Sequence, residues 1–200
     1  MRNPFIFTSI TIFSFMAASV SYAEESVPKA VKKNAIIVKL GTFTLAEKEQ
    51  TVAGSNLTFD ENSTSVFDVE YTRRFGNHFT YGGEIIHYTN TYNDFIDGEV
   101  ETIVATANIK KYFDVATHFQ PFIGAGIGIA SIGVTGSFDG NASGLAASAS
   151  VGAEIPFEYV GIHLEYRYIN ATPDGETTFG QTAKFNVSGS ALLAGVSIHF

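Results

Sequence analysis

The sequence contains no cysteine, and this absence excludes several kinds of protein. Without cysteine there is no disulfide framework, no thiolate metal site and no lipid-modified N-terminal cysteine. Basic residues are also scarce, since 12 Lys and Arg stand against 20 Asp and Glu, for a formal net charge of −8. Binding to nucleic acid needs a basic stripe, so an acidic chain of this kind argues against a nucleic-acid partner.

Long apolar runs are missing after residue 23. No later stretch approaches 18 uncharged apolar residues, so the sequence predicts no membrane-spanning helix there. If the rest of the chain enters a membrane, it must cross as strands, because only helices and closed barrels satisfy their backbone groups in lipid.

The first 23 residues have the pattern of a secretory signal peptide. A positive start at Arg2 precedes the mostly apolar, uncharged stretch 5–20, and small residues stand at Ser21 and Ala23, where a signal peptidase reads the chain. Glu24 follows directly, which argues against a buried helix. The sequence therefore predicts export of the mature chain.

From residue 34 onward, runs with a period of two alternate with polar loops rich in Asn, Asp, Gly, Ser and Thr. In the run 160–168, Val160 and Leu164 fall on one face, whereas His163 and Glu165 fall on the other. Eight such runs occur, at 34–45, 65–75, 79–90, 100–113, 121–130, 145–155, 160–168 and 191–200. This pattern predicts an all-β chain with an even number of antiparallel strands.

The expected connections alternate in length. The short ones are 76–78, 114–120 and 156–159, and the long ones are 46–64, 91–99, 131–144 and 171–186. Short turns on one side and long loops on the other are typical of outer-membrane barrels, in which both termini lie on the periplasmic side. Aromatic residues flank the short turns, and Phe200 ends the chain at the same level, which predicts an aromatic girdle there.

A soluble lipocalin-like barrel is the main alternative, and it would bury the apolar face and expose the charged one. In the runs 121–130, 145–155 and 191–200, the face opposite the apolar one carries mainly Gly, Ala and Ser. These small residues suit the crowded interior of a narrow barrel better than a surface in water. We therefore predict an eight-stranded antiparallel transmembrane up-and-down β-barrel with short periplasmic turns and longer extracellular loops. The expected boundaries are 1–23 for the signal peptide, 24–33 for a periplasmic N-terminal segment and 34–200 for the barrel domain.

Charges on the inner face should occur with matched signs, because unpaired charges in a closed lumen are costly. Eight strands leave an interior just wide enough for side chains to fill, so we expect a salt-bridged polar plug, with a proton or ion pathway as the alternative. The predicted lumen network consists of Lys39, Glu70, Arg74, Glu84, Glu154, His163, Glu165 and Arg167.

Three stretches resemble a known family. They are PFIGAGIGIA at 121–130, LEYRY at 164–168 and the C-terminal alternation that ends in Phe200. They are similar to the small eight-stranded outer-membrane proteins, the OmpA/OmpX/OmpW-like and opacity-protein-like porin family, over nearly all of the mature chain. The resemblance implies the outer membrane of a Gram-negative bacterium, with outer-membrane lipid and lipopolysaccharide around the barrel. It also implies that Phe200 belongs to the signal read by the barrel-assembly machinery.

The function expected from these features is that of a non-enzymatic, monomeric envelope barrel without cofactor or metal. It would stabilise the envelope or present its acidic loops to an extracellular ligand or host surface. The OmpW-like resemblance suggests an alternative, a narrow channel for small hydrophobic molecules or ions.

A lipid A deacylase similar to PagL is a further alternative, because YRYINA at 166–171 faintly resembles the active-site strand of that group. A serine nucleophile needs an adjacent base, but Ile169 and Asn170 stand where a His and Ser pattern would be expected. His163 and Glu165 share one face and could form an acid/base pair, although we expect a structural contact between them. The glycines at 124–133 fail the dinucleotide-binding spacing, and the five histidines show no metal-ligand spacing.

Overall fold

The computed structural model describes residues 32–200 apart from 48, 53–54, 60–62, 77, 94–97, 114–118, 136–139 and 178–181. The predicted signal peptide at 1–23 and nearly all of the predicted segment 24–33 lie outside the described residues. No helix in the described part of the chain has the length and hydropathy to span a membrane.

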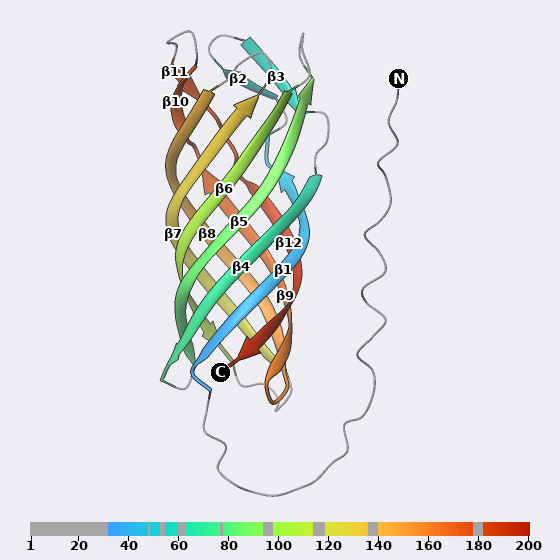
Figure 1. Ribbon diagram of the computed structural model, residues 1–200, viewed down its shortest axis with the longest axis vertical. Helices are drawn as coiled ribbons and strands as arrows, with labels where there is room; N and C mark the ends of the chain where they lie inside the picture. The colour runs from blue at the N-terminus through green and yellow to red at the C-terminus, as the bar shows by residue number, and fades with distance from the viewer. Residues whose placement is uncertain are drawn as a thin grey trace, which may run out of the picture. The chain divides into compact units, whose positions relative to one another are not determined.

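Eight long strands form a closed antiparallel barrel (Figure 1). They are β1 (Asn34–Leu45), β4 (Ser63–Phe75), β5 (Phe79–Asn93), β6 (Gly98–Tyr112), β7 (Gln120–Thr135), β8 (Gly140–Pro156), β9 (Val160–Ala171) and β12 (Gly189–His199). Each pairs with its neighbours in chain order, and β1 closes the ring by pairing with β12. The prediction of an eight-stranded up-and-down barrel is confirmed.

Four short strands lie at the end of the barrel opposite the C-terminus (Figure 1). They are β2 (Glu49–Val52), β3 (Ser55–Phe59), β10 (Asp174–Thr177) and β11 (Thr182–Lys184). In the β2–β3 hairpin, β3 pairs with Tyr92 and Asn93 at the end of β5, whereas β10 pairs with both β8 and β11. We call this the long-loop end, and we call the end at which β4 connects to β5, β6 to β7 and β8 to β9 the short-turn end.

The predicted long connections 91–99 and 131–144 are wrong in extent, because most of these residues are strand. β5 and β6 continue to Asn93 and Gly98, and β7 and β8 continue to Thr135 and Gly140. Their outward residues are polar in this region, which hides the alternation and imitates a loop in the sequence.

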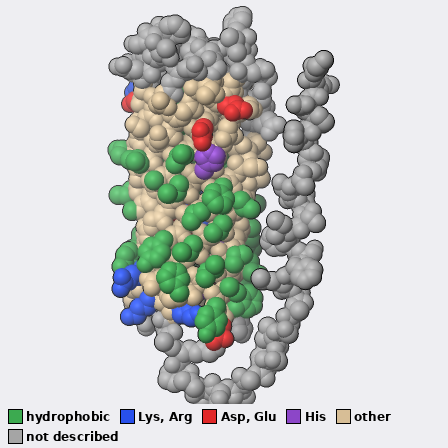
Figure 2. Space-filling model, in the orientation of Figure 1, with side chains coloured by type: hydrophobic (Ala, Val, Ile, Leu, Met, Phe, Trp, Pro, Cys, Tyr) green, Lys and Arg blue, Asp and Glu red, His purple; other side chains and the backbone are tan. Residues whose placement is uncertain are grey.

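The exterior of the barrel carries a broad belt of apolar side chains. Figure 2 shows hydrophobic side chains gathered over the part of the barrel nearer the short turns, with acidic and histidine side chains above them. Exposed members include Ile36, Leu40, Ile85, Ile109, Ile123, Ile127, Ile129, Leu145, Val151, Ile162, Leu164, Leu192, Val196 and Ile198. Soluble monomers rarely expose contiguous apolar patches of more than a few hundred Å². The soluble lipocalin-like alternative is therefore wrong, since it requires this face to be buried.

Each edge of the belt has its own composition. Toward the long-loop end, the outward positions become polar at Glu101, Ser131 and Ser143. At the short-turn end, exposed aromatic rings form the predicted girdle, which comprises Phe75, Phe79, Phe113, Phe119, Phe157, Tyr159 and Phe200. An apolar band bounded by aromatic rings is the surface that a membrane barrel presents to lipid.

The interior has two layers of different chemistry. Its short-turn half holds buried charges, and its long-loop half holds an apolar cluster. Members of that cluster include Phe43, Val66, Ile86, Tyr88, Val100, Val104, Ile132, Ile169, Phe185, Val187 and Leu193. The expectation of a polar lumen therefore holds for the short-turn half alone. Toward the long-loop end, the residues on the inward faces are apolar, as at Phe43, Ile86 and Val104.

Residues 185–188, which we call the strap, close the apolar layer at the long-loop end. Phe185 and Val187 are both buried in it. The backbone N–H of Val187 donates to Ala171 O at 3.1 Å, and its carbonyl accepts from the Tyr88 hydroxyl at 2.9 Å. Because Tyr88 lies on β5, this hydrogen bond ties the strap to a strand that is distant in the sequence.

Candidate functional site

The candidate site is a network of buried charges in the short-turn half of the lumen. Its charged members are Lys39 on β1, Asp68 and Glu70 on β4, Glu84 on β5, Lys110 on β6, and Glu165 and Arg167 on β9, each no more than 4% exposed. Every one occupies an inward position of its strand, so the period of two alone directs them to a common centre.

Two lysines and two glutamates form the middle of the network. The Nζ atom of Lys39 lies 2.7 Å from Glu70 Oε2 and 3.1 Å from Glu165 Oε2. The Nζ atom of Lys110 lies at the same distances from the same two oxygens. Each ammonium group therefore bridges carboxylates from β4 and β9, which are not neighbours in the barrel. Lys39 also lies 2.9 Å from Asp68 Oδ2.

Arg167 extends the network toward the apolar layer. Its Nε atom donates to Glu165 Oε1 at 2.7 Å, and Nη2 donates to the same oxygen. Its Nη1 atom lies 2.5 Å from Glu84 Oε2 and 3.3 Å from Asp68 Oδ2. The guanidinium thus connects three carboxylates, and its charge-assisted hydrogen bonds are of the strong kind.

Neutral side chains add hydrogen bonds to two of the carboxylates. Thr106 Oγ1 donates to Glu84 Oε1 at 2.6 Å, and Asn108 Nδ2 donates to Glu70 Oε1 at 3.1 Å. Buried charges require partners on most of their lone pairs. Together with the ion pairs, these contacts connect strands that are not neighbours in the barrel.

His163 lies at the edge of the network. Its Nε2 atom is 2.9 Å from Glu165 Oε2, and its ring stacks on Phe122 with 4.9 Å between centroids. Nδ1 is buried without a hydrogen-bond partner among the described residues. The network beside it contains four carboxylates and three permanent cations.

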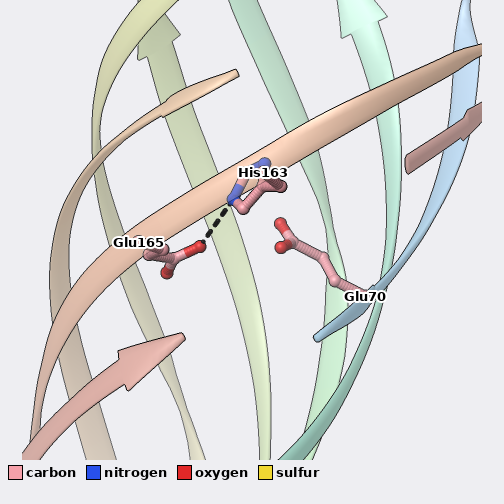
Figure 3. A group of neighbouring side chains, drawn as sticks. All are labelled: Glu70, His163 and Glu165. Carbon is pink, nitrogen blue, oxygen red and sulfur yellow. Dashed lines mark hydrogen bonds and ion pairs between the residues drawn. The ribbon is translucent and has the colours of Figure 1, made fainter. Parts of the chain in front are cut away.

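Figure 3 shows Glu70, His163 and Glu165, whose potential ligand atoms lie within 4.8 Å of one another. Such a set of atoms has the chemistry of a cation site. However, Lys39 and Lys110 both contact Glu70 Oε2 and Glu165 Oε2. A metal ion would have to displace two ammonium groups from a sealed interior, so the arrangement is better described as a salt-bridge centre.

A second, smaller polar group lies nearer the short turns. Ser197 Oγ donates to Glu154 Oε1 at 2.5 Å, and His199 Nε2 lies 3.0 Å from Ser197 Oγ and 2.9 Å from Glu154 Oε1. These are the residue types of a hydrolase triad. In such a triad, however, the carboxylate and the serine meet opposite nitrogens of the histidine ring, whereas here both meet Nε2. Ser197 is also fully buried, so the group is built as a structural contact.

The structure brings six of the eight predicted network residues into one set of contacts: Lys39, Glu70, Glu84, His163, Glu165 and Arg167. Glu154 belongs to the smaller group. Arg74 also lies on the inward face, but it is the second-last residue of β4 and is half-buried there. No contact among the described residues joins it to the network. The prediction for Arg74 is wrong because this residue lies nearer the short-turn end of β4 than Glu70 does, below the level of the network.

Sequence reasoning left Asp68 and Lys110 out of the network. Both lie on the inward face by simple alternation, since Asp68 is two residues before Glu70 and Lys110 is two residues after Asn108. The alternation of the runs 65–75 and 100–113 already puts both on the inward face, so it was enough to include them. The two residues weighed for the deacylase face opposite ways, with Ile169 buried and Asn170 exposed, so they cannot act together.

No protein-family model matches the sequence, and no curated protein matches it. Solved structures do match. Neisserial surface protein A is 18% identical, with a TM-score of 0.55, and covers 84% of this chain and 96% of its own. The outer membrane protein OprG from Pseudomonas aeruginosa is 12% identical, with a TM-score of 0.54, and covers 84% and 97%. Outer Membrane Protein W of E. coli is 16% identical, with a TM-score of 0.51, and covers 86% and 100%. The chain therefore has the fold of the small eight-stranded outer-membrane barrels.

Proposed function

Starting from that fold, we propose that the protein is a non-enzymatic, monomeric barrel of the bacterial outer membrane. The belt spans the lipid, the short turns face the periplasm, and the long-loop end faces the exterior. In this position the protein stabilises the envelope and presents its long loops to a ligand or host surface.

The observation that carries this proposal is the closure of the lumen at two levels. At the polar level, Lys39, Asp68 and Glu70 have no exposed surface. At the apolar level, the same is true of Phe43 and Tyr88. A water-filled pore would expose the side chains along its wall. Their complete burial supports a solid interior that braces the barrel.

The test combines localisation with conductance. The mature protein should fractionate with outer membranes and change its mobility in detergent gels on heating, as folded barrels do. In planar bilayers the refolded protein should give no discrete conductance. Reproducible openings that disappear in Arg167→Ala would overturn the closed-barrel proposal and favour transport.

A narrow conduit for small hydrophobic molecules is the second candidate. The apolar layer favours it, because Phe43 and Tyr88, stacked with centroids 4.0 Å apart, lie directly behind the strap. Movement of the strap would open an apolar chamber above the charges. Uptake of an alkane into liposomes that contain the protein, compared with liposomes without it, separates this candidate from the structural role.

The deacylase has the least support. Its test is release of fatty acid from lipid A by the refolded protein. We expect no release, since the one serine, histidine and carboxylate group in the described lumen has the wrong nitrogen geometry and is buried.

A further inference from the structure

Three cations point outward at the short-turn end of the barrel. Lys32 precedes β1, Arg73 lies on β4 opposite Tyr81, and Lys111 lies on β6 opposite Phe79. Figure 2 shows Lys and Arg side chains just beyond the apolar belt on this side of the barrel. Arg73 and Lys111 occupy the same faces of their strands as the lipid-facing residues Tyr71 and Ile109, so they lie outside the lumen. Lys32 is half-buried and lies over the exposed ring of Tyr159.

Aromatic rings hold two of these cations in place. The Nζ atom of Lys32 lies 3.1 Å from the centroid of the Tyr159 ring and donates to His199 O at 3.2 Å. The Nζ atom of Lys111 lies 5.3 Å from the Phe113 centroid and 5.8 Å from the Phe79 centroid. Cations over aromatic faces are attracted to them, and their apolar stems can lie along the belt while the charged ends stay at its edge.

Among the described residues at this edge, acidic side chains are nearly absent. On the described outward faces of the strands at the short-turn end there is no Asp or Glu, and Glu158 lies in the turn after β8. At the long-loop edge of the belt the balance reverses, since Glu99 and Glu101 are exposed on β6. The exterior therefore carries positive charge at one edge of the belt and negative charge at the other.

We propose that this basic–aromatic girdle, formed by Lys32, Arg73 and Lys111 with Phe79, Phe113 and Tyr159, binds the phosphate groups of anionic phospholipids. The inference rests on the proposed function, because it requires the belt to lie in a bilayer. The cations then sit at the depth of the headgroups in the leaflet that faces the short turns. A basic residue near an anionic lipid surface is attracted to it, whereas a zwitterionic surface offers no net charge.

Spin-labelled lipids give a direct test. The full barrel is reconstituted in phosphatidylcholine bilayers at low salt, and the association of spin-labelled phosphatidylglycerol is compared with that of spin-labelled phosphatidylcholine. The wild type should prefer phosphatidylglycerol severalfold, since one cation near an anionic surface contributes a factor of about five. The triple variant K32Q/R73Q/K111Q should lose most of this preference. High salt should also reduce it in the wild type, because exposed charges are screened.

Lys184→Gln is the matched control. Lys184 is an exposed cation on β11 at the other end of the barrel, with 76% of its side chain accessible. Its loss should leave the preference unchanged. K184Q removes one positive charge and the triple variant removes three. If K184Q lowers the preference for phosphatidylglycerol by as much per charge removed, the preference depends on net charge and the girdle proposal is wrong. If the triple variant loses association with spin-labelled lipid A and keeps its preference for phosphatidylglycerol, the proposed occupant is wrong.

The heat shift in detergent gels separates this inference from the proposed function. A protein that inserts, shows the shift and has no lipid preference overturns the girdle alone. A protein that never inserts overturns the membrane proposal itself. The triple variant should retain the heat shift, because all three substitutions are at the surface.

Discussion

Glu70 and Glu165 enter the lumen from two non-adjacent strands, and their Oε2 atoms share the same two ammonium groups, each 2.7 Å from Glu70 and 3.1 Å from Glu165. Each carboxylate therefore pairs with both lysines, and each lysine pairs with both carboxylates. These ion pairs connect β4 and β9 through the lumen. The loss of either glutamate should therefore destabilise the barrel by more than the loss of a single ion pair would.

Glu70→Gln should lower the free energy of unfolding by about 3 to 5 kcal/mol, because removing one partner leaves buried charge uncompensated. Urea unfolding in detergent micelles, followed by circular dichroism, measures this. Glu101→Gln is the control, since Glu101 pairs with His87 on the exterior, where 60% and 42% of the two side chains are accessible, and should cost less than about 1 kcal/mol. Equal losses in the two variants would contradict the bracing role of the network.

The architecture was predictable because the strands alternate so regularly. Within β9, every second residue from Gly161 to Arg167 is buried and every intervening one is exposed. A single assignment of faces therefore placed His163, Glu165 and Arg167 together in the lumen without knowledge of their contacts.

Two features could not be read from the same pattern. The strand extensions near Asn93 and Thr135 lie beyond the belt, where outward side chains are polar and the period of two is no longer visible as apolar alternation. The level of a residue along the barrel axis depends on the stagger between strands, which local sequence does not encode. For this reason Arg74 was placed in the network, although β4 carries it past the level of Glu70.

The orientation of the faces makes a second prediction. Ile127, on β7, is 74% exposed near the middle of the belt. Ile127→Arg should destabilise the barrel in bilayers by about 2 to 4 kcal/mol, because a charge there must enter hydrocarbon. Ser131→Arg, on the same strand and face but at the edge of the belt, should cost about 0 to 1 kcal/mol. Equilibrium unfolding from phospholipid vesicles gives both values, and equal costs would mean that the belt is misplaced.

The strap should loosen when its link to β5 is removed. Tyr88→Phe deletes the hydroxyl that donates to the Val187 carbonyl while keeping the ring that stacks on Phe43. The expected loss is about 1 kcal/mol, the usual value of one hydrogen bond. Hydrogen exchange should accelerate at 185–188 and stay unchanged at the centre of β7. Uniform acceleration across the barrel would indicate that the hydroxyl stabilises the whole fold.

Phe200 provides the last prediction, because its ring and its backbone have separable roles. Its N–H and carbonyl pair with Asn34 at 2.9 and 3.0 Å, whereas its side chain is 54% exposed on the outward face. Phe200→Ala keeps the backbone pair, so the free energy of folding in detergent should change by less than about 0.5 kcal/mol.

If the Phe200 ring belongs to an assembly signal, Phe200→Ala should insert slowly through the assembly machinery in cells. Phe157→Ala removes another girdle ring, which is 52% exposed, and should insert at the normal rate. Similar delays in both variants would assign the effect to the girdle and not to a signal at the chain end.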